Sequence, residues 1–184
     1  ILRNGLAVNS AGSYTGNNMS SQCSDTGDTQ LQAISNANGN TGSINDVTYV
    51  QFDFTPLTDR FSFNYIFSSN EYGTFQCGFS DVFAFILTDL VTGVTTNLAV
   101  VPSTTTPVSV TTIRNNAHNA TCASVNPLLF DVYNVGAPTS VMNMRGYTVP
   151  LTAFADVIPN RNYRIKLAIG DYSDTAFDSA VFIE

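Results

Sequence analysis

The sequence predicts an all-β fold: an antiparallel β-sandwich of two sheets, of the jelly-roll or lectin-like kind. Three observations support this prediction. Apolar and polar residues alternate with a period of two in several segments, aromatic and β-branched residues dominate these segments, and Gly, Pro, Asn and Asp cluster between them. With 184 residues, of which 43% are apolar, the chain is long enough for one core. We therefore expect a single domain over residues 1–184.

The clearest strands are expected at residues 61–67 and 163–169, where apolar side chains occupy every second position. Residues 82–87 are apolar on both faces, which predicts a central strand covered from both sides. About ten strands are expected in all. The other clear ones are residues 47–54, 98–101, 108–113, 128–133, 149–155 and 180–183.

The only helical signal lies at residues 28–37. Asp28 is a suitable N-cap, and Leu31 and Ile34 would share one face of a helix. We expect no more than one short turn of helix there.

Composition excludes several classes of partner. The chain has 7 basic and 14 acidic residues, a net charge of −7, so it lacks the basic surface that binds nucleic acid or anionic membranes. No apolar run reaches the ~18–20 residues of a membrane span, so no direct membrane insertion is expected. Polar surface comes mainly from Asn, Thr and Ser, which suits an extracellular protein. The N-terminus shows no signal-peptide pattern, so we expect a mature or excised piece.

Carboxylates cluster after the strand expected at residues 163–169. Asp171, Asp174 and Asp178 lie within eight residues, and such crowded charges repel unless a cation or hydrogen bonds compensate them. Ca²⁺ binds six to eight oxygen ligands, which carboxylates, carbonyls and waters supply. The sequence thus predicts a calcium site in this loop. The alternative is a solvated turn whose Asp side chains bond to their own backbone.

A second acidic segment lies between the strands at residues 61–67 and 82–87. It contains Glu71 and, directly before an apolar strand, Asp81. A carboxylate in that position is costly unless something satisfies it. Because loops at one end of a sandwich converge, these two residues are expected to join the 171–178 loop in one site. The alternative is that both accept backbone N–H groups and only shape their own loop.

The three cysteines show no zinc-ligand spacing. In an oxidising compartment they give one disulfide and one free thiol. A Cys77–Cys122 bridge would join two loops, but pairing of Cys23 with either of them, or with another chain, stays open. The single histidine, His118, lies four residues before Cys122, and we expect a structural cysteine there rather than a nucleophilic pair. Asn18 and Asn119 begin N-glycosylation sequons.

Four segments resemble the bacterial choice-of-anchor L domain family. Residues 61–72 (FSFNYIFSSNEY) and 77–87 (CGFSDVFAFIL) are similar to its F-x-Y-x-F-A-S-E-E-Y and F-N-D-x-F-G-F-F-L motifs. Residues 27–31, leading to 50–54, and residues 100–111 resemble its earlier and central segments. Residues 167–182 (LAIGDYSDTAFDSAVF) resemble its final motif, L-A-I-A-D-x-x-D-x-x-Y-D-S-A-V-F.

The resemblance implies a location more than a chemistry. Such domains occur in secreted bacterial surface proteins that carry alternative C-terminal anchors, and the family supplies no catalytic residues. Asn70 stands where the family usually has a second Glu, and the segment before Gly5 is short. Its recurrent acidic residues, taken here as the expected metal ligands, fall on Asp28, Glu71, Asp81, Asp171, Asp174 and Asp178.

The leading hypothesis is a noncatalytic module of a bacterial surface protein with a structural Ca²⁺ and an adhesion or matrix role. Its expected partners are other surface or matrix molecules, including glycans contacted by Tyr14, Tyr72 or Tyr172, and copies of itself. A fibre or pilus-like subunit that exchanges strands is the alternative. A glycoside hydrolase using Glu71 and Asp81 is less favoured. Known nucleophile, zinc-protease and phosphate-loop motifs are absent from the sequence.

Overall fold

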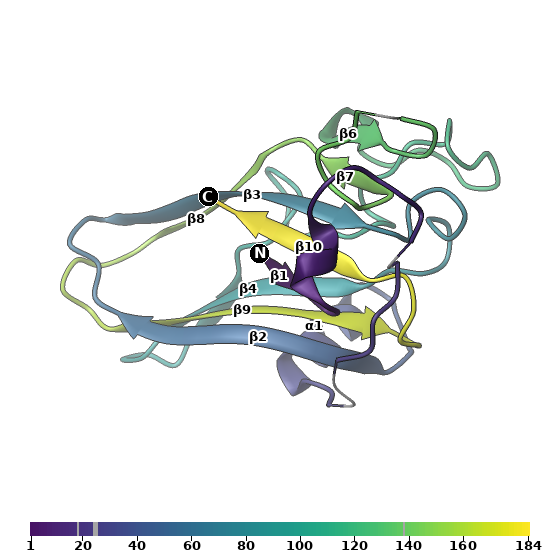
Figure 1. The fold of residues 1–184 in the computed structure, drawn as a ribbon. Helices are drawn as coiled ribbons and strands as arrows, with labels where there is room; N and C mark the ends of the chain where they lie inside the picture. Colours follow the sequence, from purple (N-terminus) through teal and green to yellow (C-terminus); the bar gives the residue numbers. More distant parts are fainter. Residues whose placement is uncertain (18, 24–25, 138) are drawn as a thin grey trace.

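Two antiparallel β-sheets pack face to face in the computed structural model, which describes residues 1–17, 19–23, 26–137 and 139–184 (Figure 1). The larger sheet has the order β1-β10-β3-β7-β6, with β8 also paired to β3, and the smaller sheet has the order β2-β9-β4-β5. The strands are β1 (Leu2–Arg3), β2 (Ile44–Phe54), β3 (Arg60–Ser69), β4 (Val82–Asp89), β5 (Thr95–Asn97), β6 (Phe130–Tyr133), β7 (Gly146–Thr148), β8 (Leu151–Asp156), β9 (Tyr163–Tyr172) and β10 (Ser179–Ile183).

The predicted sandwich is confirmed, and its core follows the period-two alternation. Tyr163, Ile165 and Ile169 of β9 are buried between the sheets. Aromatic rings from the facing strands interlock there, with Tyr65 and Phe85 4.9 Å apart and edge-on. The strand order does not establish a jelly roll.

The helix is longer than predicted. It spans α1 (Thr29–Ala37), and the Asp28 carboxylate caps it by accepting the backbone N–H groups of Gln30 and Leu31. Leu31 is fully buried against the outer face of the smaller sheet, where it joins a cluster that includes Val82, Ala84 and Ile86 of β4. This helix covers the second face of β4, which explains why that strand is apolar on both sides.

Two predicted strands, residues 98–101 and 108–113, are not strands. The chain makes only the isolated bridges Val100–Pro107 and Arg114–Val125 there. Pro102 and Pro107 lack the N–H that a ladder requires, so regular pairing stops. The apolar residues of these segments nevertheless enter the core, and this is why their pattern resembled a strand. Short strands β1 and β7 were not anticipated, and Pro127–Leu129 forms a 3-10 turn.

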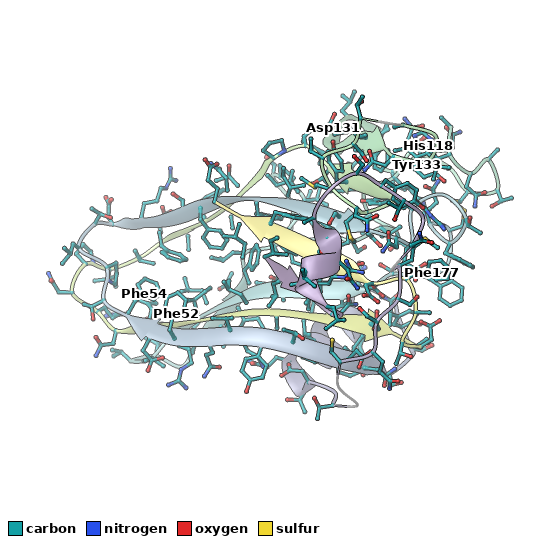
Figure 2. The ribbon with its side chains drawn as sticks, viewed as in Figure 1. Phe52, Phe54, His118, Asp131, Tyr133 and Phe177 are labelled. Carbon is teal, nitrogen blue, oxygen red and sulfur yellow. A yellow bond between two sulfur atoms is a disulfide. The ribbon has the colours of Figure 1, made fainter. Side chains whose placement is uncertain are left out.

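Antiparallel pairing places four strand ends together. β3 and β9 finish, and β4 and β10 begin, at the end of the sandwich where Phe177 lies; Phe52 and Phe54 lie toward the other end (Figure 2). The loops 70–81 and 171–178 are therefore neighbours, and we call this region the acidic end. No helix among the described residues is long and apolar enough to cross a membrane.

The dual role of Asp28 yields a first prediction. Besides capping α1, Asp28 forms an ion pair with Lys166 of β9, a nearly buried lysine that also donates to Gln30 at 3.1 Å. Asp28→Ala should lower the free energy of unfolding by about 3–5 kcal/mol, because it leaves a buried ammonium unpaired and removes the cap. Asp28→Asn retains a cap and should cost about 1 kcal/mol less.

Urea unfolding at pH 7 measures these differences. Asp53→Ala is the matched control, since the ion pair of Asp53 with Arg164 is exposed and should contribute no more than about 1 kcal/mol. Equal losses of unfolding free energy in Asp53→Ala and Asp28→Ala would contradict the conclusion that burial makes the ion pair of Asp28 with Lys166 important for stability.

Candidate functional site

Strand register brings the acidic residues of both sheets together. Val82 pairs with Gly170 across β4 and β9, so the next residues, Asp81 and Asp171, lie side by side. In the larger sheet the Asn70 N–H donates to the Asp178 carbonyl at 3.1 Å, which places Glu71 beside them. We call Glu71, Asp81, Asp171 and Asp178 the acidic cluster. All four side chains are buried.

The amide of Asn4 links two of these carboxylates. Its Nδ2 donates to Asp171 Oδ1 at 2.6 Å and to Asp81 Oδ2 at 3.1 Å, while its Oδ1 accepts the Ser179 N–H at 2.7 Å. Asp81 also accepts the Ser179 hydroxyl at 2.7 Å and the Tyr172 N–H at 3.2 Å. Both oxygens of Asp81 are thus hydrogen-bonded.

Asp178 is neutralised by a buried arginine. Arg3 Nε and an Nη atom lie 3.0 and 2.9 Å from Asp178 Oδ2, and both side chains are fully buried. Ser21 adds its N–H and hydroxyl at 3.0 and 2.7 Å. Gly5 passes so close that an added Cβ would lie 1.8 Å from Asp178 Oδ2. The N-terminal segment is therefore fastened to the acidic end through Asp178.

Among the described residues, two oxygens of the cluster have no hydrogen-bond partner. They are Oε2 of Glu71, a residue 2% exposed, and Oδ2 of Asp171, which is fully buried. Burial, followed by the charges of Asp81 and Asp174, raises the pKa of Glu71 to about 9. Burial and Asp81 also raise the pKa of Asp171 strongly. If all four carboxyl groups were ionised, the acidic end would thus carry more negative charge than its own hydrogen bonds satisfy.

The other two predicted ligands lie differently. Asp174 is exposed at the rim, where its Oδ1 accepts the Ala176 N–H at 3.0 Å. Asp28 forms an ion pair with Lys166 of β9. Lys166 comes five residues before Asp171 on the same strand, which places this ion pair about 17 Å from Asp171. The described residues contain no group of three or more Asp, Glu, His or Cys side chains arranged to hold a metal ion.

Sequence reasoning missed several participants. Asp46 is fully buried at an irregularity of β2, with a left-handed φ of 48°, and its charge contributes to the raised pKa of Asp171. Arg3 and Asn4 precede the first recognisable motif, so nothing in the sequence marked them. Asn70, where the family usually has Glu, accepts the Arg145 N–H at 2.9 Å and donates to the Met19 carbonyl at 3.1 Å.

A half-buried arginine and an aromatic ring border the cluster. The Arg145 guanidinium lies 5.3 Å from the ring of Phe177, and its charge partly offsets the raised pKa of Glu71. Phe177 has φ of 63°, an uncommon value for a bulky residue, and its ring packs against Phe75 at 4.6 Å. Tyr72, considered above for glycan contact, is fully buried and so excluded from that role.

The Cys77–Cys122 disulfide is present, and Cys23 is free and exposed. Together with hydrogen bonds from Asn119 Nδ2 to the Gly73 and Thr74 carbonyls, at 2.9 and 3.2 Å, the bridge joins loop 115–126 to loop 70–81. Asn18, which begins the other glycosylation sequon, lies outside the described residues.

A nucleophilic Cys–His pair is ruled out, because Cys122 is oxidised. His118 stacks on Tyr133 with ring centres 4.3 Å apart, and burial lowers its pKa (Figure 2).

The fold and the disulfide together define a disulfide-bonded β-sandwich module, a type of domain that is found in exported proteins. More specifically, the chain belongs to the choice-of-anchor L domain family, whose model matches residues 1–184. Comparisons with curated proteins and with solved structures found no match. The family and the disulfide both indicate a secreted or surface protein.

The buried Arg3–Asp178 pair yields the second prediction. Arg3→Met should lower the free energy of unfolding by about 3–5 kcal/mol, because Asp178 would remain buried without its counter-charge. Arg60→Met is the matched control: Arg60 and Asp156 form an ion pair with side chains 60% and 85% exposed, which contributes at most about 1 kcal/mol. Urea unfolding of both variants measures the difference, and a loss below 1 kcal/mol for Arg3→Met would contradict it.

Proposed function

We propose that this chain is a noncatalytic module of a bacterial surface protein, with an adhesion or matrix role, whose acidic end is stabilised by a structural Ca²⁺ ion. One observation carries the proposal: Glu71 Oε2 and Asp171 Oδ2 are buried carboxylate oxygens without hydrogen-bond partners in the part of the chain that the structure describes. Unsatisfied buried oxygens of this kind are stabilised either by protons or by a cation.

The charges favour a cation at neutral pH. Asp178 is paired with Arg3, and Arg145 is half-buried beside Glu71. No basic side chain of residues 1–17, 19–23, 26–137 or 139–184 is in hydrogen-bond contact with Asp81 or Asp171. Asp46 and Asp174 add further negative charge to the same region. Without an ion, Glu71 and Asp171 keep their protons well above the ordinary carboxyl pKa, and a divalent ion would replace these protons and relieve the mutual repulsion of the carboxylates.

The available donors favour calcium among divalent ions. They are all oxygens: carboxylates of the acidic cluster, nearby backbone carbonyls and water. His118 is stacked on Tyr133, and two cysteines form the disulfide, so the exposed Cys23 is the one thiol left free among the described residues. Ca²⁺ accepts six to eight oxygens in flexible geometry, whereas Mg²⁺ demands a near-ideal octahedron. Binding would require Glu71 or Asp171 to turn its free oxygen toward a common point.

Burial also supports a noncatalytic role. A glycosidase pair must flank a bound sugar, but Glu71 and Asp81 are both buried, and Asp81 is fully hydrogen-bonded to the protein itself. An ion at this position would instead hold loops 70–81 and 171–178 and the N-terminal segment in fixed positions. A rigid surface of loops is what a binding module presents to its partner.

Strand exchange is the alternative function, and the shortness of the edge strand β1 supports it. This edge strand has only two residues, so few ladder bonds hold it. However, the adjoining Arg3 and Asn4 bind the acidic cluster, so an exchanged strand would have to supply equivalent groups.

Calcium removal tests the proposal. Adding Ca²⁺ at about 100 times its Kd should stabilise the protein by about 2.7 kcal/mol relative to EDTA, which raises Tm by about 5–10 °C for a chain of this size. Glu71→Gln should abolish the calcium shift, because it replaces a carboxylate ligand by a neutral amide. Asp156→Asn, at an exposed site, should keep the full shift. An unchanged wild-type Tm, or a Glu71→Gln variant that still responds, would overturn the calcium proposal.

The raised pKa values predict opposite pH trends with and without calcium. A carboxyl group whose folded pKa lies above its unfolded pKa contributes stability at low pH that is lost as pH rises through the folded pKa. The pKa of Glu71 rises from 4.5 to about 9, so in EDTA the stability should fall between about pH 5 and 9.

Because calcium binds the deprotonated carboxylates, the calcium-induced rise in Tm should grow over the same range. Melting curves of wild type and Glu71→Gln across this range measure both trends. Because His118 is present in both proteins, its contribution cancels when the two curves are compared. A calcium shift that shrinks with rising pH would contradict this assignment.

A further inference from the structure

A cavity lies at a second position, away from the acidic cluster. β5 is the edge strand of the smaller sheet, and β8 pairs only with β3. A cavity of about 960 Å³ opens between them, walled by the end of α1, β5, the 98–107 loop and β8. Its volume is within the range of small-ligand sites.

The cavity lining is uncharged. Its residues are apolar, Pro, Ser, Thr or Asn, with no Asp, Glu, Lys, Arg or His among them, although the chain has a net charge of −7. An ionic ligand would lose hydration there without gaining a counter-charge. The lining therefore selects for an uncharged ligand.

Free hydroxyl groups distinguish this cavity from a purely apolar one. The side chains of Thr96, Ser103, Thr105 and Thr106 are exposed, and within the described part of the chain their hydroxyls make no hydrogen bond to protein. The apolar part of the wall includes Leu98 and Leu151, which also belong to the core. A ligand with both C–H faces and hydroxyl groups matches this mixture.

The shape favours an elongated ligand. A second cavity of about 510 Å³ shares Thr96, Leu98 and Phe154 with the first, so the two form one groove. Asp89 and Asp156 border its second part, and each is ion-paired with an arginine. The ring of Phe154 lies where they meet and is 55% exposed. The Arg60 guanidinium lies over this ring, 5.0 Å from its centre, and the exposed part of the ring offers an apolar surface on which the C–H side of a sugar ring packs.

The backbone disfavours an added peptide strand on the loop wall. Several of its N–H groups are already used, since Val101 donates to the Thr106 carbonyl at 2.8 Å and Val108 to the Ala99 carbonyl at 3.0 Å. This leaves few main-chain groups on the loop for strand addition, whereas the side-chain hydroxyls are free. We infer that this groove binds a neutral oligosaccharide, with Phe154 packing against a sugar ring and the threonine hydroxyls contacting its hydroxyl groups.

The test titrates the intact chain with three neutral hexasaccharides: α-1,4-glucose, β-1,4-glucose and β-1,4-N-acetylglucosamine. Calorimetry should find saturable binding of at least one. Phe154→Ala should weaken that binding about fivefold to tenfold, and Thr105→Val should weaken it by a smaller factor. The control Leu57→Ala, at a residue 84% exposed and outside the groove, should bind like wild type.

Three results would overturn the inference: no binding of any of the three sugars at millimolar concentration, equal binding by wild type and Phe154→Ala, or tighter binding of an oligogalacturonate or an uncharged extended peptide. The Glu71→Gln variant separates this inference from the calcium proposal. Its groove should bind sugar as wild type does, because none of the acidic cluster lines the groove.

Discussion

The position of Asn4 between Asp81 and Asp171 is the constraint on which the acidic end depends. One amide nitrogen holds two buried carboxylates, and the same side chain accepts a hydrogen bond from the first residue of β10. Since Asp81 and Asp171 come from the smaller sheet and Ser179 from the larger one, Asn4 joins both sheets. Packing of the loops therefore depends on a few polar contacts that apolar residues could not replace.

The exposed ion pairs and the buried acidic cluster of the protein lie in different parts of the fold. Its exposed ion pairs, such as Arg164 with Asp53, lie on strand surfaces and contribute little to stability. The buried carboxylates of the acidic cluster gather where strands end, whereas the buried Lys166, paired with Asp28, lies in the middle of β9. The aromatic core between the sheets carries most of the stability, whereas the acidic end sets which loop arrangement is allowed.

Much of this arrangement follows from sequence periodicity, and some does not. The alternation in residues 61–67 and 163–169 predicted two core strands, and the antiparallel order then placed Glu71, Asp81 and Asp171 together. Residues 108–113 were wrongly predicted to be a strand, because their apolar side chains enter the core without forming a ladder. Arg3 and Asn4 were not predictable, since partners that are distant in sequence leave no local pattern. The grouping of threonines around the groove likewise depends on tertiary contacts.

The engagement of Asn119 has a practical consequence for producing this protein. N-linked sugars attach to Nδ2, the atom that here donates to the Gly73 and Thr74 carbonyls. In a eukaryotic secretory host, a chain glycosylated at this sequon before folding could not form both contacts, and the loops beside the disulfide would have to settle differently. Material for crystals or assays is therefore better obtained by periplasmic expression in bacteria, where the thiols oxidise and the asparagine stays unmodified.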